Sequence, residues 1–84
     1  MAYSISILRL AQKELADLPA DSYSRIRDAI RSLSHEPRPP GCRKLVGRQG
    51  WRVRVGDYRV ICEVDDRLRS ITVLHIGHRR DVYR

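Results

Sequence analysis

The sequence predicts an α+β fold in which an N-terminal strand and an antiparallel helix pair precede an antiparallel β-meander sheet packed on the helices. Alternating apolar residues open the chain, two stripes at helical spacing follow, and alternation returns after residue 42. With 84 residues, the chain is expected to form a single domain over residues 1–84 with a thin core.

The N-terminal half carries the strand and both helices. Tyr3, Ile5 and Ile7 alternate with serines, which predicts a half-buried strand. Two stripes then recur at helical spacing and are expected to face the sheet: Leu8, Ala11, Leu15 and Leu18, then Tyr23, Ile26, Ile30 and Leu33. Pro19 separates them, and a proline is tolerated in the first turn of a helix, with Asp21 or Ser22 as alternative caps.

A proline-rich connector ends the second helix. Residues 35–41 hold three prolines, which cannot continue a helix. A short strand is expected over residues 42–46, and a basic loop over residues 47–50 leads into the next strand.

The segment from Trp51 to Val64 predicts a β-hairpin around Gly56-Asp57. Glycine in the first position of a two-residue loop favours a type II′ turn. This turn opposes Arg54 to Arg59, and it places Arg52, Arg54 and Arg59 on the face away from the predicted core. Facing arginines destabilise a sheet, so the cluster suits a bound anion, while a solvated outer face is the alternative interpretation.

A further strand is expected over residues 69–77. A turn centred on Asp66-Arg67 would oppose Cys62 to Ile71 and Val60 to Val73, which points His75 into the core. Thr72, Leu74 and Ile76 would then extend the arginine side as an apolar strip. Such a strip is either a docking surface or a minor cluster covered by the C-terminal segment.

The charge is strongly positive and uneven. The formal net charge is +7, of which residues 1–42 carry +1 and residues 43–84 carry +6. Clustered basic charge is typical of proteins that bind nucleic acid or an acidic protein. No stretch is long and apolar enough for a membrane span, and the first ten residues do not fit a signal peptide, so we expect a cytoplasmic protein without membrane contact. Cys42 and Cys62 are expected to be reduced thiols.

Phosphate chemistry is the reaction class that these side chains suit. The sequence has no H-E-x-x-H, P-loop or G-x-G-x-x-G motif, and its histidines and cysteines do not fit a metal site. Guanidinium groups stabilise charge on a phosphoryl group, and a histidine can carry protons near neutral pH. His78 is the preferred proton carrier and Glu63 a weaker one. Tyr83 would offer a ring for stacking a base if the tail lies beside the arginines.

Two motifs carry a family resemblance. Gly-Asp-Tyr-Arg at 56–59 and Gly-His-Arg-Arg-Asp-Val-Tyr at 77–83, within the predicted order of elements, resemble the RelE branch of the RelE/ParE toxin superfamily, with its RelE-like microbial RNase fold. The resemblance implies the toxin of a type II toxin–antitoxin system, a ribosome-dependent endoribonuclease that cuts mRNA in the A site of the 70S ribosome. It also implies attack by the 2′-hydroxyl, no metal or cofactor, and inhibition by a cognate RelB-like antitoxin with an acidic or amphipathic segment.

The resemblance also implies roles for individual residues. Arg52 and Arg54 occupy the family's paired basic positions, Arg59 the phosphate-stabilising position, Arg79 the position near the leaving oxygen, and Tyr83 the base-stacking position. Lys44, Arg48 and Arg80 are expected to add RNA contacts. The best-studied members carry lysines at the paired positions, and an arginine does not give up its proton. We therefore expect His78 to take a larger acid–base share.

Two other functions fit the same features. One is a ParE-like toxin that poisons DNA gyrase on the same scaffold, and the other is a basic nucleic-acid-binding module without catalysis. If induction stops protein synthesis, the chain is the endoribonuclease, and if it stops DNA replication, the chain is the gyrase poison. Binding that weakens steeply with salt, without a cut product, would identify the module.

Overall fold

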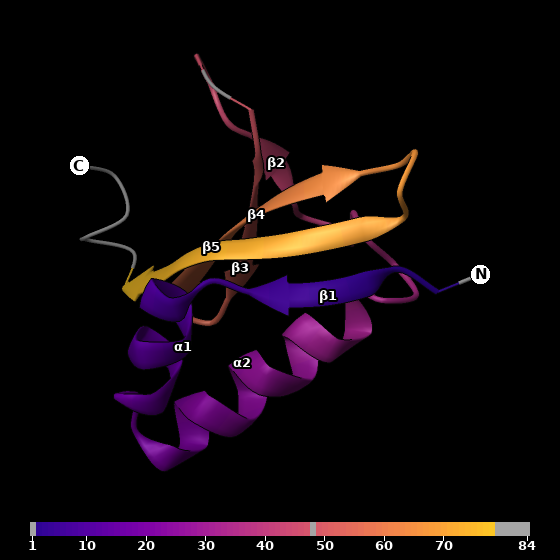
Figure 1. The fold of residues 1–84 in the computed structure, drawn as a ribbon. Coiled ribbons are helices and arrows are strands. Elements are labelled where there is room, and N and C mark those ends of the chain that lie inside the picture. Colours follow the sequence, from indigo (N-terminus) through magenta and orange to yellow (C-terminus); the bar gives the residue numbers. More distant parts are fainter. Residues whose placement is uncertain (1, 48, 79–84) are drawn as a thin grey trace.

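Two helices lie on one side of a five-stranded sheet in the computed structural model, which describes residues 2–47 and 49–78 (Figure 1). The elements are β1 (Ser4–Ile7), α1 (Arg9–Ala16), α2 (Ala20–Ser32), β2 (Arg43–Lys44), β3 (Trp51–Val55), β4 (Tyr58–Asp65) and β5 (Ser70–His78). The sheet order is β1-β5-β4-β3-β2. The predicted α+β class is confirmed, and β1 joins the sheet parallel to β5, so the sheet is mixed. Neither α1 nor α2 is long and apolar enough to cross a membrane.

The helix stripes form most of the helical side of the core. Buried residues from both helices and from the strands join in one cluster: Ala11, Ile26, Ile30, Leu33, Val53, Val60, Cys62, Ile71, Val73 and Ile76. Pro19 precedes the first residue of α2, and its carbonyl accepts the Tyr23 amide at 2.8 Å. Leu8 departs from the prediction. Its amide donates to the Val73 carbonyl at 3.0 Å, which extends the β1 edge, and its side chain stays exposed.

The hairpin between β3 and β4 has the predicted register. Val55 lies opposite Tyr58, Arg54 opposite Arg59, and Val53 opposite Val60. Gly56 has a φ of +59° and Asp57 has no positive φ, as a type II′ turn requires. The guanidinium of Arg25 covers this turn, because its Nη2 lies 3.2 Å from the place where a Cβ on Gly56 would stand.

The predicted register between β4 and β5 is wrong. Cys62 pairs with Val73 rather than Ile71, because the loop between the strands takes in residues 66–69. A β-bulge then interrupts the ladder between Ile61 and Cys62, so that Ile61 pairs with His75 and Val60 with Ile76. One extra residue on β5 moves each later side chain of this strand to the opposite face of the sheet from the one predicted. Ile76 is therefore in the core, and His75 points to the other face.

The strand predicted over residues 42–46 is limited to Arg43–Lys44. The chain leaves the sheet after Leu45, whose amide donates to the Gly50 carbonyl at 3.0 Å. Gly50 has a φ of +127°, and a Cβ there would lie 3.0 Å from Leu45 Cδ1. The return into β3 thus depends on glycine.

A hydrogen-bonded network fixes the proline connector to the sheet. Arg38 donates to both carboxylate oxygens of Asp66, at 3.2 and 2.8 Å, and the Tyr3 hydroxyl donates to Asp66 Oδ1 at 2.7 Å. The Arg38 guanidinium also lies 5.1 Å from the centre of the Trp51 ring. The bonds from Arg38 and then Tyr3 lower the pKa of Asp66, and the bond to Asp66 raises the pKa of Tyr3.

Both cysteines are free thiols, as predicted. Cys62 is in the core, where burial is the main cause that raises its pKa to about 11. Its thiol is thus protonated near neutral pH and packs as a small apolar group.

Candidate nucleic-acid interface

Four arginines lie on the sheet face opposite the helices, and we call this side the arginine face. Val53 and Val60 point into the core, so their neighbours along β3 and β4 point the other way. Arg43 on β2 stands opposite Arg52 on β3, and Arg54 stands opposite Arg59 across the hairpin. The face therefore carries Arg43, Arg52, Arg54 and Arg59.

Arg59 differs from the others in its burial. Arg59 is only 7% exposed, although its side chain carries a permanent charge. Strand β4 is central in the sheet, and on β5 Arg59 lies opposite Gly77, which has no side chain to occupy the space. Arg59 is thus largely buried, while Arg54 is exposed and donates from Nε to the Gly56 carbonyl at 3.3 Å.

Arg43 is a residue of this face that the sequence analysis missed. Lys44 was expected to contact RNA, but it lies opposite Trp51 and so belongs to the core-facing side of the sheet edge. The alternation along β3 places Arg52 on the arginine face, and the residue paired with Arg52 on β2 must lie on the same face. The boundaries of a two-residue strand hid which residue that partner is.

His78 does not lie on the arginine face. It pairs with Tyr58, and the two rings meet edge to face with centroids 5.5 Å apart, on the side of the sheet that Tyr58 shares with the core. Glu63 does lie on the arginine face, opposite Thr72. The remaining predicted site residues, Arg48, Arg79, Arg80 and Tyr83, are outside the described residues.

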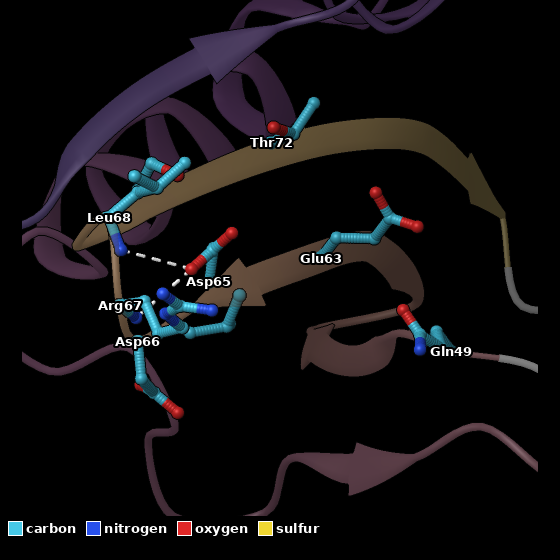
Figure 2. Close-up of a pocket in the computed structure, with 9 residues that line it drawn as sticks. Gln49, Glu63, Asp65, Asp66, Arg67, Leu68 and Thr72 are labelled. Carbon is cyan, nitrogen blue, oxygen red and sulfur yellow. Dashed lines mark hydrogen bonds between the residues drawn. The ribbon is translucent and has the colours of Figure 1, made fainter.

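An acidic groove lies at the other end of the arginine face. It encloses about 550 Å³ at the β4–β5 turn, and Figure 2 shows Glu63 and Thr72 projecting from neighbouring strands. Asp65 adds a second carboxylate, which accepts the backbone amides of Arg67 and Leu68, each at 3.0 Å. Arg67 also lines the groove, and the Asp66 carboxylate is paired with Arg38. The face is therefore basic toward the β3–β4 hairpin and acidic toward the β4–β5 turn.

This charge arrangement favours an anion at the arginine end. The arginines can offer paired donors to phosphate oxygens, and the sheet holds their backbone positions fixed. Carboxylates at the other end repel a phosphate. A polyanionic strand is thus expected to cross the arginine end and to avoid the groove.

Comparisons with known proteins agree with the architecture. Residues 5–83 match a family described as the ParE toxin of the type II toxin–antitoxin system, parDE. The chain is 31% identical over 88 residues to toxin RelG of Mycobacterium tuberculosis, with 100% of this chain and 99% of the relative covered.

Solved structures show the same fold. The RelE–RelB complex of Pyrococcus horikoshii contains a chain with a TM-score of 0.84 and 33% identity, and the match covers 94% of this chain and 97% of that one. A chain of the RelBE2 toxin–antitoxin complex of Mycobacterium tuberculosis has a TM-score of 0.80 and 23% identity, with 93% and 99% covered, and supports the fold alone.

Proposed function

The chain belongs to the RelE/ParE superfamily of type II toxins, and from this premise we propose that it is an endoribonuclease that cuts mRNA in the ribosomal A site. The proposed reaction is attack of the 2′-hydroxyl on the adjacent phosphorus, which leaves a 2′,3′-cyclic phosphate and a free 5′-hydroxyl. Negative charge grows on the phosphoryl oxygens during this step. Groups that meet that charge in a fixed position lower the barrier.

The observation that carries the proposal is the buried Arg59 within a set of four arginines. Arg59 stands across from Arg54, and Arg52 and Arg43 continue the positive charge along the face. Like charges directly opposite each other on a sheet are destabilising. A phosphate at the arginine end relieves that repulsion, and the restricted Arg59 side chain is suited to the transition-state oxygens.

The partner that we propose is an antitoxin of the RelB type. The 33% identical chain from Pyrococcus horikoshii was solved in a RelE–RelB complex. A net charge of +7 favours an acidic segment of the antitoxin, which would cover the arginine face and exclude RNA. Arg79 near the leaving oxygen and Tyr83 as the base-stacking ring remain proposals on the strength of the family motif, and Arg48 and Arg80 remain proposed RNA contacts.

The test is induction of the chain in cells, with and without its antitoxin. Expected results are an arrest of protein synthesis before DNA synthesis, and new mRNA 5′ ends within translated codons by primer extension. Arg54→Ala should remove these ends. Arg31→Ala, on the exposed side of α2, is the matched control and should keep them.

A gyrase-poisoning toxin is the second candidate, favoured by the parDE description of the matching family. It predicts that replication stops first and that mRNA stays intact. Such a result, with Arg54→Ala as toxic as the unaltered chain, would overturn the endoribonuclease proposal.

A further inference from the structure

A histidine on the arginine face is clamped by a carboxylate from α1. Nδ1 of His75 lies 2.9 Å from Oε1 and 2.7 Å from Oε2 of Glu14. Glu14 Oε1 also accepts the backbone amide of Ile76 at 2.9 Å. The carboxylate is thus fixed from two directions, and both groups are only partly exposed.

The topology explains why Glu14 reaches this edge of the sheet. Strand β1 ends at Ile7, opposite Val73, so β1 does not cover the outer edge of β5 beyond that point. Helix α1 follows β1 directly and packs against β5. The Glu14 side chain therefore takes the Ile76 amide that a longer β1 would have paired.

The β-bulge determines which face His75 occupies. Val73 and Ile76 are both buried in the core, so the residues between them point away from it. His75 stands opposite Ile61, which alternates along β4 with Arg59. Because Arg59 pairs with Gly77, His75 is its diagonal neighbour, and such neighbours have Cα atoms about 7–8 Å apart.

The clamp leaves one ring nitrogen for chemistry. A carboxylate only accepts hydrogen bonds, so Nδ1 carries the proton and Nε2 of the neutral ring has a free lone pair. Among the described residues, none forms a hydrogen bond with Nε2. The same division of roles orients the histidine in serine hydrolases.

We propose that His75 is the catalytic base of RNA cleavage and that Glu14 is its positioning residue. This inference rests on the proposed endoribonuclease function. Nε2 takes the 2′-hydroxyl proton while the 2′ oxygen forms its bond to phosphorus. The bond from phosphorus to the 5′ oxygen breaks, and the imidazolium returns the proton to that leaving oxygen.

The paired arginines make such a base necessary. Arg52 and Arg54 stay protonated at any physiological pH and cannot accept the proton. His78, the histidine favoured by the sequence analysis, packs its ring on Tyr58 on the other side of the sheet. Among the described residues, the charged groups on elements around His75 are Glu14 from α1, Arg59 from β4, and Arg52 from β3, which shares its row through Ile61.

The test measures single-turnover cleavage of mRNA on purified 70S ribosomes. His75→Ala should slow cleavage by about 10²- to 10⁴-fold, the usual range for a lost acid–base group, and added imidazole should restore part of the rate. Glu14→Gln should lower the maximal single-turnover rate by a smaller factor and leave the half-saturating concentration unchanged. His35→Gln, at an exposed histidine beyond α2, is the control and should match the unaltered chain.

Each outcome bears on one of the two proposals. If the unaltered chain cuts mRNA and His75→Ala cuts within threefold of it, the role of His75 is overturned. Loss of cleavage in His78→Gln but not in His75→Gln would also overturn it. His75→Gln keeps an N–H that can donate to Glu14, so it serves where His75→Ala does not fold. An unaltered chain that cuts no mRNA overturns the endoribonuclease function itself, and the role of His75 with it.

Discussion

Arg59 shows how one residue can be costly for the fold and useful for a reaction. Burying a permanent charge is unfavourable unless other groups compensate for the lost water. The chain places Arg59 on its central strand, where it is largely buried and lies opposite Gly77 of β5, which has no side chain. A guanidinium held in this way needs no rearrangement when phosphate charge develops, which is the property expected of a transition-state donor.

Replacing Arg59 by alanine should remove that donor. We expect a loss of about 10²- to 10³-fold in kcat, or about 2.7–4 kcal/mol of transition-state stabilisation, as for one preorganised donor. Cleavage of mRNA on programmed ribosomes at saturating concentration measures this kcat, and thermal unfolding checks that the variant is folded. Arg31→Ala is the control for simple loss of positive charge. A tenfold or smaller effect in a folded Arg59→Ala protein would contradict the assignment.

At the scale of elements, patterns that depend on neighbours in sequence were predictable and long-range register was not. The hairpin was placed correctly because a two-residue turn fixes every pair beyond it. The bulge at Ile61 and Cys62 carries no such local signal, and it decided the positions of His75 and Ile76. Lys44 rather than Arg43 was likewise expected to contact RNA, because a strand this short has no periodicity that shows which residue faces which side.

Strand β2 supplies a matched pair of variants for RNA binding. Arg43 faces the arginine side and Lys44 the other, so Arg43→Ala should weaken single-stranded RNA binding and Lys44→Ala should not. One lost phosphate contact should reduce the slope of log K against log salt by about 0.7. Fluorescence anisotropy across a salt series measures both. Equal slopes for the two variants would mean that the face on which a β2 side chain lies does not determine whether it contacts RNA.

The network around Asp66 predicts a pH dependence of stability. Its pKa is lowered in the folded chain, so unfolding takes up a proton at acidic pH. The stabilisation is present above the ordinary Asp pKa and is lost as the pH falls from about 5 through the lowered value. Asp66→Asn should lower Tm at pH 7 and flatten the fall of Tm below pH 5. Tyr3→Phe removes the weaker bond and should give an intermediate slope. Identical slopes in Asp66→Asn and the unaltered chain would refute the coupling.

At the scale of the whole molecule, the sheet separates two surfaces. The helices and the core lie on one side (Figure 1). Among the described residues no helix lies on the opposite side, which carries the arginines at one end. The groove at the other end of the same face carries the carboxylates of Glu63 and Asp65, with Arg67 beside them (Figure 2). The net charge alone would predict that RNA binds anywhere on this chain. The arrangement of charges instead limits a bound RNA strand to the arginine end of the face.

Glu63 tests whether that boundary acts on RNA. At a separation of about 8 Å in water, one charge contributes about 0.5 kcal/mol, or roughly a twofold change in Kd. Glu63→Gln should therefore tighten single-stranded RNA binding about twofold at low salt, and the gain should disappear at high salt because ions screen it. Asp21→Asn on α2 makes the same change of charge on the helical side and should have no effect. Weaker binding by Glu63→Gln would show instead that the strand runs into the groove and hydrogen-bonds with this carboxylate.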